Sequence, residues 1–415
     1  MPLLRVSPPR LFSIPCASKW ALLVLLADAV LTAAVVAKVP FTDIDWESYM
    51  AEVDFVLAGQ YDYQEITSPN GPIAYPAGFV WFYGALRWAR LEVRQVQALF
   101  AVIYLGMMVV LHQIYHHAGA PLWVFALCVL SKRVHSVFVL RLFNDAVAQF
   151  FCYAALLLFL QRRHLMCSLS YSLAVSIKMQ PLLICPVVGL CLVASGGWSH
   201  ALLCIACMLA LQLVLAVPFL HANAPAYLGR AFGGPGDLQP AWSVNWRFLP
   251  EALFSRKELS ILLLLVHVLL LLWFAQVRWI DGGFLSRTIR KWRCSACLSD
   301  QSVVAMWFTC NFIGIACLRT MHFQYLVWYF HTIPYLAYCC FGSGRLHHAA
   351  ATAIITLLVE VPFIVTTHGE VRGPDGRRWT SPGLPTSLGS ILLQATHWFL
   401  LFGLLVQSCR KGKTD

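Results

Sequence analysis

The sequence is short of charge. Only 12% of its 415 residues are Asp, Glu, Lys or Arg, whereas soluble globular domains carry about 25%. Hydrophobic residues make up 59% of the chain. This balance excludes a water-soluble enzyme, a disordered chain and a fibrous protein. It predicts one membrane-embedded domain over residues 1–415.

Signatures of several other classes are also absent. One CxxC motif, from Cys294 to Cys297, has no second pair, which argues against a zinc site. Lys and Arg are scattered rather than gathered into a stripe, so the net charge of +11 does not indicate nucleic-acid binding. No Asn-x-Ser/Thr acceptor site for glycosylation occurs. The first apolar run lacks a cleavage context and indicates an uncleaved signal anchor.

Apolar runs dominate the remainder of the chain. A helix needs about 20 mostly apolar residues to cross a membrane. Twelve segments are candidates: 20–37, 96–114, 121–140, 145–160, 167–179, 181–195, 201–220, 259–277, 302–318, 322–341, 348–366 and 387–408. Pro181 separates the short pair 167–179 and 181–195, which is therefore a candidate for a broken or re-entrant element. We expect an all-α polytopic membrane protein with about twelve transmembrane helices.

The placement of charge predicts the orientation of these helices. If Met1 is cytosolic and every segment crosses, the cytosolic segments are 1–19, 161–166, 278–301, 342–347 and 409–415. They carry fourteen Lys and Arg against three Asp, so the entire net charge of +11 falls on the cytosolic side, as the positive-inside rule requires. Both termini are then cytosolic tails (1–19 and 409–415), and the long loops 38–95 and 221–258 face the opposite side.

The loop over residues 38–95 is rich in acidic and aromatic side chains. Apolar residues from Trp46 to Val56 recur at helical spacing, which predicts an amphipathic helix on the membrane surface. Asp43 and Asp45 stand just before it. Paired carboxylates can bind a divalent cation or take a proton from a hydroxyl group, and a solvated acidic loop is the simpler interpretation.

Further ionisable residues stand where spans meet, and such groups usually face one another or a cavity. They are Arg133, His135, Arg141 and Asp145, then Lys178, and then Arg319 and His322. Arg and His supply donors for a phosphate oxygen. The structural alternatives are an Arg141–Asp145 pair four residues apart, a Lys178 that reaches for the interface, and an Arg319 within an aromatic belt.

Several ordered motifs resemble one known family. They are FTDIDW (41–46), YMAEV (49–53), GQYDY (59–63), YPAGFV (75–80), RVHS (133–136), FVLRLFND (138–145), SLAVSIKM (172–179), VNWRFLPEA (244–252), NFIGI (311–315) and WYFH (328–331). In this order they resemble the dolichyl-phosphate-mannose-dependent α-1,3-mannosyltransferases of asparagine-linked glycan assembly. Motifs of this length and order are far more specific than a single short pattern.

The resemblance implies a C-type glycosyltransferase fold in the endoplasmic reticulum membrane, with a luminal active site in the loop 38–95. The implied donor is dolichyl-phosphate mannose, and the implied acceptor is Man5GlcNAc2 on dolichyl diphosphate, which becomes Man6GlcNAc2. We expect no cofactor, no metal ion and no nucleic-acid partner. Lys411 and Lys413 resemble a cytosolic dilysine retrieval signal.

The same resemblance suggests roles for individual residues. A β-linked mannosyl phosphate that gives an α-linkage must invert at the anomeric carbon, so one carboxylate, Asp43 or Asp45, would act as base. Arg319, His322 and, less strongly, Lys178 would hold the leaving phosphate. The candidate substrate contacts are Trp46, Tyr49, Arg133, His135, Arg141, Asn144, Asp145, Asn245, Arg247, Gln324 and Tyr329.

Two alternatives remain open. The family usually has Glu at the position of Asp43, whereas a true DxD triplet occurs in the related mannosyltransferase of glycosylphosphatidylinositol assembly. The second alternative is not an enzyme but a polytopic transporter of lipids or sugars, which would carry charged groups near the middle of the membrane. Here the ionisable residues gather at one side, which favours surface chemistry over passage.

Overall fold

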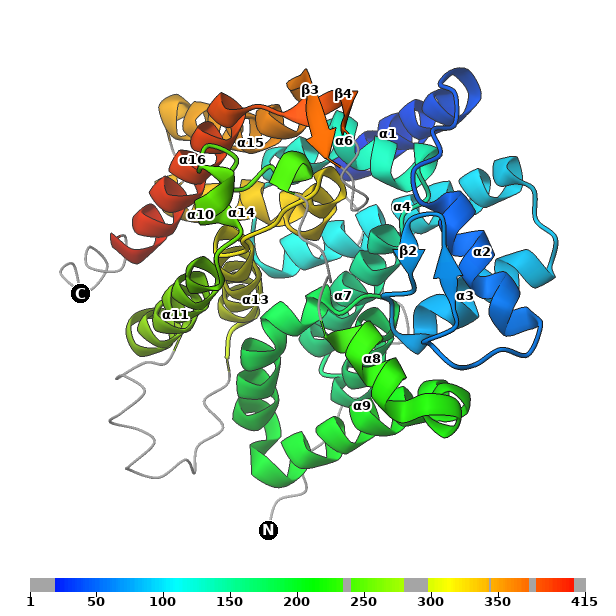
Figure 1. The fold of residues 1–415 in the computed structure, drawn as a ribbon. Helices are drawn as coiled ribbons and strands as arrows, with labels where there is room; N and C mark the ends of the chain where they lie inside the picture. Colours follow the sequence, from blue (N-terminus) through cyan, green and yellow to red (C-terminus); the bar gives the residue numbers. More distant parts are fainter. Residues whose placement is uncertain (1–18, 234–239, 280–297, 343–344, 373–377, 407–415) are drawn as a thin grey trace, which may run out of the picture.

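A computed structural model describes residues 19–233, 240–279, 298–342, 345–372 and 378–406, and these form a helical bundle with two small hairpins (Figure 1). The expected CxxC motif, the two cytosolic tails (apart from Lys19) and the dilysine signal lie outside these residues. The all-α expectation is therefore correct for the bundle and misses the hairpins.

The elements follow one another along the chain with short connections. The helices of the first half are α1 (Lys19–Lys38), α2 (Trp46–Leu57), α3 (Ala77–Trp88), α4 (Val93–His117), α5 (Leu122–Ala126), α6 (Lys132–His135), α7 (Asn144–Leu160), α8 (His164–Ile177) and α9 (Cys185–Phe232). Those of the second half are α10 (Glu251–Phe254), α11 (Lys257–Phe274), α13 (Asp300–Ala316), α14 (Ile333–Phe341), α15 (Leu346–Ile364) and α16 (Ser387–Val406).

Short elements link and cap these helices. Short stretches of 3₁₀ or π helix lie at Leu127–Leu130, Ser136–Leu140, Gln180–Ile184, Pro240–Trp242, Ala275–Trp279, Phe323–Trp328 and Phe330–Thr332. Strand β1 (Thr67–Ser68) pairs antiparallel with β2 (Gly71–Pro72). Strand β3 (Thr366–Arg372) pairs antiparallel with β4 (Arg378–Pro385), from Thr366 opposite Pro385 to Arg372 opposite Arg378.

The expected count of twelve spans is not confirmed. Within the described residues six helical stretches are long and apolar enough to cross a membrane, or seven if the bent pair Leu122–Leu130 and Lys132–Leu140 is one span. All twelve predicted segments are at least partly helical. However, α7 and α8 fall short of spanning length and α13 is buried along almost its whole course. The difference comes from length: α7, α8, α13 and α14 have 17, 14, 17 and 9 residues, and the segments 181–195 and 201–220 lie on one helical stretch, Gln180–Phe232.

Two predicted features are modified by packing. Helix α9 turns sharply at Gly197, whose φ of 76° is open to glycine, so the segments 181–195 and 201–220 fall on separate arms. Helix α2 forms where an amphipathic helix is expected, and its buried face packs on α3: the Tyr49 ring lies 4.8 Å from that of Tyr83.

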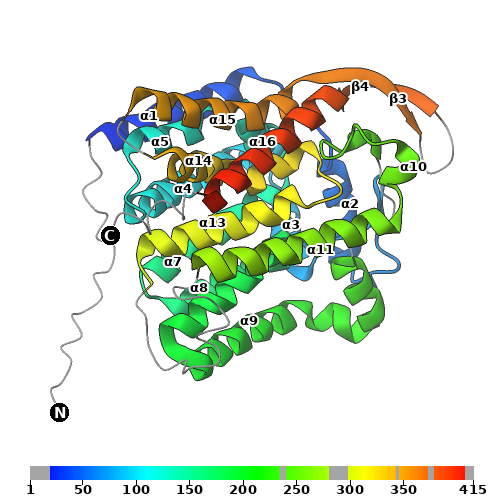
Figure 2. The same ribbon diagram turned by 90° about the vertical axis from the view of Figure 1, so that its left-hand side faces the viewer.

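Contacts between connecting segments fall into two sets at opposite ends of the bundle. At one end, Asp62 accepts a hydrogen bond from Asn223, at 3.0 Å; Figure 2 shows α2, α10 and the β3–β4 hairpin toward this end. In the other set, Asp300 contacts His117 at 2.7 Å and Arg162 at 3.1 Å. Each contact joins segments that the charge pattern places on the same side of the membrane.

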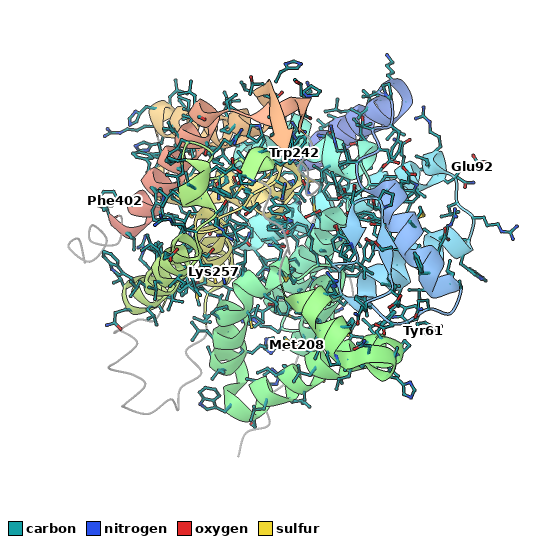
Figure 3. The ribbon with its side chains drawn as sticks, in the orientation of Figure 1. Tyr61, Glu92, Met208, Trp242, Lys257 and Phe402 are labelled. Atoms are coloured by element: carbon teal, nitrogen blue, oxygen red, sulfur yellow. The ribbon has the colours of Figure 1, made fainter. Side chains whose placement is uncertain are left out.

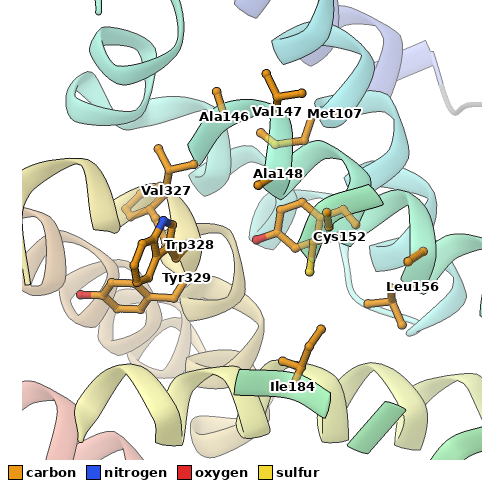
Figure 4. Close-up of a cluster of buried hydrophobic side chains, with 14 of the residues drawn as sticks. Met107, Ala146, Val147, Ala148, Cys152, Leu156, Ile184, Val327, Trp328 and Tyr329 are labelled. Atoms are coloured by element: carbon orange, nitrogen blue, oxygen red, sulfur yellow. The ribbon is translucent and has the colours of Figure 1, made fainter. Parts of the chain in front are cut away.

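Between these ends the interior is apolar and closely packed. Ala148 and Cys152 of α7 belong to one cluster of buried apolar side chains with Val327 and Tyr329 (Figure 4). Large apolar side chains also cover the outside of the bundle. Phe402 of α16, at its edge in Figure 3, is 67% exposed. An exposed apolar face of this kind suits lipid rather than water.

Gly78 allows α3 to approach α8 closely. A Cβ atom at Gly78 would lie 2.1 Å from Ser176 Oγ and 2.9 Å from the Ser176 carbonyl carbon, so the backbone itself is in the way. This close approach brings the end of α8 beside the segment that precedes α3. The consequence is that Lys178, two residues after Ser176, lies over the Tyr75 ring.

We predict that Gly78→Ala destabilises the protein by about 1–3 kcal/mol, the usual cost of overpacking, because α3 and α8 must separate. Gly84→Ala is the matched control, since it lies on the same helix and its added Cβ meets no atom within 4 Å. Thermal unfolding of the two purified variants in detergent measures the difference. Equal midpoints would show that the α3–α8 contact does not depend on Gly78.

Candidate active site

The two carboxylates of the DxD triplet have different surroundings. The exposed Asp43 accepts hydrogen bonds on Oδ1 from the backbone N–H groups of Trp46, at 3.0 Å, and Glu47, at 3.4 Å. These are N–H groups that the first turn of α2 leaves without a helical partner, so Asp43 caps the helix. Asp45 instead turns toward the protein interior.

Asp45 is held by two side chains. The Asn70 amide donates to Oδ1 at 3.1 Å, and the Tyr49 hydroxyl lies 3.3 Å from Oδ2. Burial raises the pKa of the Asp45 carboxyl to about 6; the Lys178 ammonium opposes this rise, and the nearby Asp145 carboxylate adds to it. A carboxyl group with this pKa is ionised at neutral pH and still basic enough to accept a proton.

Lys178 lies at the centre of the site. It follows the last residue of α8, where the chain becomes extended before Pro181, so the predicted break between 167–179 and 181–195 places a lysine there. Its Nζ lies 2.7 Å from Asp145 Oδ1 and 3.3 Å from Asn144 Oδ1. The rings of Tyr75, Tyr325 and Trp328 surround the ammonium, with their centroids 5.4 to 5.7 Å from Nζ.

Asn144 and Asp145 begin α7 and complete the site. The Trp328 indole donates to Asp145 Oδ1, and the Tyr49 hydroxyl lies 3.3 Å from Asn144 Oδ1. Asp145 Oδ2 and Asn144 Nδ2 are buried and have no hydrogen-bond partner among the described residues. A buried polar atom of this kind usually finds a partner in water or a ligand.

We call Asp45, Tyr49, Asn144, Asp145 and Lys178 the acid–lysine cluster. All five were predicted from the sequence. Of the predicted phosphate ligands, His322 also belongs near it, because the charges of Lys178 and Asp145 both act on its imidazole. The cluster thus joins two carboxylates, an amide, a phenol and a fixed cation from three separate stretches of the chain.

Three predicted substrate contacts are engaged in structural roles. His135 Nε2 lies 2.9 Å from the buried Asp28 carboxylate. This contact connects the bent pair Leu122–Leu130 and Lys132–Leu140 to α1. The Arg133 guanidinium donates to the Phe363 carbonyl and stacks over a phenylalanine ring. Arg141 donates to Ser136 rather than to Asp145, so the alternative of an Arg141–Asp145 pair is not found.

Three other predicted site residues, Asn245, Arg247 and Arg319, form their hydrogen bonds with residues outside the cluster. Asn245 donates to the carbonyls of Ile315 and Leu318, and the backbone N–H of Arg247 donates to Ser390. Arg319 donates to the carbonyl of Arg256 at 3.1 Å.

The aromatic candidates divide in the same way. The Trp46 ring packs 6.1 Å from Tyr83, and the Tyr329 hydroxyl lies 3.0 Å from His397 Nε2, so both belong to the core. Gln324 is only half-buried, two residues from His322. An aromatic or polar residue in a family motif therefore does not have to lie in the acid–lysine cluster.

Four residues of the site were not predicted as ligands: Asn70, Tyr75, Tyr325 and Trp328. Asn70 sits at the tip of the Pro-Asn-Gly-Pro turn. A polar side chain at the tip of a turn in the acidic loop could have been predicted as a hydrogen-bond donor to the site. The three aromatic residues lie in or near recognisable motifs, but nothing in their spacing indicates that their rings would meet around one lysine.

Comparisons with known proteins agree with one another. Residues 22–366 match the model of the family described as ALG3 protein. Over 321 residues the chain is 41% identical to the Dol-P-Man:Man(5)GlcNAc(2)-PP-Dol alpha-1,3-mannosyltransferase of Homo sapiens, covering 75% of this chain and 73% of that protein. Identity to the protein of the same name from Arabidopsis thaliana is 36% over 335 residues, covering 76% of each.

A solved structure also aligns with this one. It is the crystal structure of ArnT from Cupriavidus metallidurans bound to undecaprenyl phosphate, with a TM-score of 0.48 and 12% sequence identity. The alignment covers 94% of this chain and 77% of that one.

We predict that Lys178→Met destabilises the protein by about 3 kcal/mol, because it leaves the buried Asp145 carboxylate without a counter-charge. Arg87→Met is the control: it breaks an ion pair to Asp54 whose side chains are 49% and 46% exposed, and such pairs contribute at most about 1 kcal/mol. Unfolding midpoints in detergent test this. A Lys178→Met midpoint equal to that of Arg87→Met would contradict the buried pair.

Proposed function

The chain belongs to the ALG3 protein family, and from this membership we propose that it transfers mannose from dolichyl-phosphate mannose to Man5GlcNAc2 diphosphodolichol. The new bond would be an α-1,3 linkage and the product Man6GlcNAc2 diphosphodolichol. Relatives that share a third or more of their residues with this chain carry the name of this reaction.

One observation carries the mechanistic part of the proposal. The charge of the Lys178 ammonium, which aromatic rings surround, acts on the partly buried carboxylate of Asp45 and lowers its pKa. The transfer needs these two groups. The acceptor hydroxyl must lose a proton, and the departing phosphate gains negative charge. Tyr75, Tyr325 and Trp328 add aromatic faces on which a sugar ring can stack.

The proposed step is a single displacement with inversion. The acceptor 3-hydroxyl oxygen bonds to the anomeric carbon while the bond from that carbon to the phosphate oxygen breaks. Asp45 takes the hydroxyl proton, and dolichyl phosphate leaves beside Lys178, with His322 near it. A fixed ammonium can stabilise this leaving group directly, so we propose that the step needs no metal ion.

The geometry favours Asp45 over Asp43 as the base. Asp43 uses its carboxylate to cap α2 and is exposed, whereas Asp45 has a raised pKa and shares the cluster with Lys178. The departure from the family pattern at Asp43 then has little effect on the chemistry, because either acid can accept the capping hydrogen bonds.

We further propose that the site faces the lumen of the endoplasmic reticulum and that both termini are cytosolic. The support is that the cluster joins the loop 38–95 to Asn144 and to the ends of the predicted spans 145–160 and 167–179, which the charge pattern places on the side opposite the basic loops. In this orientation the polyprenol tail stays in lipid and its sugar meets the incoming glycan.

The direct test is transfer by the purified protein. Wild type, Asp45→Asn and Asp43→Asn are incubated with radiolabelled dolichyl-phosphate mannose and the Man5GlcNAc2 lipid acceptor in detergent, where no second compartment exists. We predict that wild type transfers mannose and that Asp45→Asn is slower by about 10²- to 10⁴-fold, the range for loss of a general base. Asp43→Asn should stay within about tenfold of wild type, as for a helix cap.

Two results would count against this assignment. If Asp43→Asn and Asp45→Asn reduce the rate of transfer by the same factor, the burial and raised pKa of Asp45 do not identify it as the base. If wild type binds the donor but transfers nothing, the transporter alternative gains support.

The pKa of Asp45 predicts an acid limb in the pH profile. Because the base must be ionised, kcat should fall about tenfold per pH unit below about 6. Lys178 lowers this pKa, so the residual activity of Lys178→Met should show its acid limb at higher pH. An acid limb that stays in place in Lys178→Met would contradict the electrostatic link between the two residues.

A further inference from the structure

A second carboxyl group is buried beside the proposed base. Glu52 lies on the inner face of α2 and is only 4% exposed. Its Oε1 is 3.2 Å from Ser68 Oγ, and its Oε2 is buried without a hydrogen-bond partner among the described residues. An ionised carboxylate in this position would leave negative charge out of water and poorly paired.

The hydrogen bonds around Ser68 indicate where the proton lies. Ser68 Oγ is also 2.9 Å from the carbonyl oxygen of Gly71, which can only accept. A hydroxyl has a single proton, so if Ser68 donates it to Gly71, the contact with Glu52 needs a proton from the carboxyl group. Glu52 is then a neutral acid that donates to Ser68.

The charges around Glu52 agree with this assignment. Burial raises the pKa of Glu52 to about 8, and the Asp45 carboxylate, on the segment before α2, adds to this rise, whereas a hydrogen bond donated by Ser68 to the carboxylate lowers this pKa. The Tyr63 and Tyr75 phenols also face it. On α3, packed against α2, Arg87 is already bound to Asp54 on the surface.

A short chain of contacts connects Glu52 to the proposed base. Ser68 pairs with Gly71 across the β1–β2 hairpin, and Asn70 stands at its tip. The Asn70 amide donates to Asp45 Oδ1 at 3.1 Å and to the Ile44 carbonyl at 3.3 Å. Anything that holds the hairpin on α2 therefore also holds the amide on Asp45.

We infer that Glu52 is a positioning residue that acts as a neutral carboxylic acid: its proton fixes the hairpin 67–72 on α2 and keeps Asn70 on the Asp45 carboxylate. This inference rests on the proposed transfer reaction. Loss of the proton leaves the single Ser68 proton to serve two acceptors, Glu52 and the Gly71 carbonyl, so one of the two hydrogen bonds is lost, and it adds a second negative charge near Asp45. Activity should therefore fall at alkaline pH, whereas protonation of Asp45 limits it at acid pH.

The test is the pH profile of kcat for mannosyl transfer in wild type, Glu52→Gln and Glu47→Gln. Wild type should lose about tenfold per pH unit above about 8. Glu52→Gln keeps a neutral donor and should retain activity at pH 7 within about threefold, lose the alkaline limb and keep the acid limb. Glu47→Gln, an exposed carboxyl on the same helix, should match wild type.

A second variant tests the direction of the hydrogen bond and keeps Glu52 in place. If Glu52 donates to Ser68, Ser68→Ala removes a stabiliser of the neutral acid, and the alkaline limb moves to lower pH. If Ser68 donates to an ionised Glu52, the limb moves to higher pH, and the inference is wrong.

The remaining outcomes are equally distinct. A folded Glu52→Gln that keeps the wild-type alkaline limb, or that is inactive at every pH, overturns the inference. Absence of transfer by wild type is instead a failure of the proposed function.

Discussion

The site depends on one buried ion pair. Lys178 and Asp145 meet at 2.7 Å with side-chain exposures of 13% and 0%, and neither charge could be buried there alone without a large cost. The pair joins the end of α8 to the start of α7, and the rings around it bring in the segments before α3 and after α13. A candidate site made from distant parts of the chain is thereby held in one arrangement.

The same pair sets the electrostatics of Asp45. Burial and Asp145 favour its protonated form, Lys178 favours its ionised form, and the balance leaves a carboxylate that is ionised at neutral pH yet remains basic. Lys178 would then serve both reactants, because it keeps the base ionised before transfer and faces the phosphate as it leaves. Asp43, two residues away, is exposed, and its carboxylate accepts hydrogen bonds from the first turn of α2 instead.

Much of this arrangement was predictable from the sequence. The helical bundle, the amphipathic helix at Trp46, the break before Pro181 and the five residues of the acid–lysine cluster all follow from hydropathy, spacing and motif resemblance. The partners of individual side chains did not follow. Arg141 and Asp145 stand four residues apart, which suggests a helical pair, but the turn between them directs Asp145 to a lysine 33 residues later. The count of spans differs because several predicted segments form helices too short to cross a membrane and two others share one helical stretch, neither of which hydropathy alone reveals.

The central claim is that Asp45 takes the proton from the acceptor hydroxyl, whose oxygen forms the new bond, while Lys178 stabilises the phosphate whose bond to the sugar breaks. A cryo-electron microscopy structure with dolichyl-phosphate mannose bound to Asp45→Asn tests it most directly. We expect the donor phosphate within hydrogen-bond reach of Lys178 Nζ and the anomeric carbon open toward residue 45. A phosphate bound elsewhere, with the side chain of residue 45 on the same face of the sugar as the phosphate, would contradict the account.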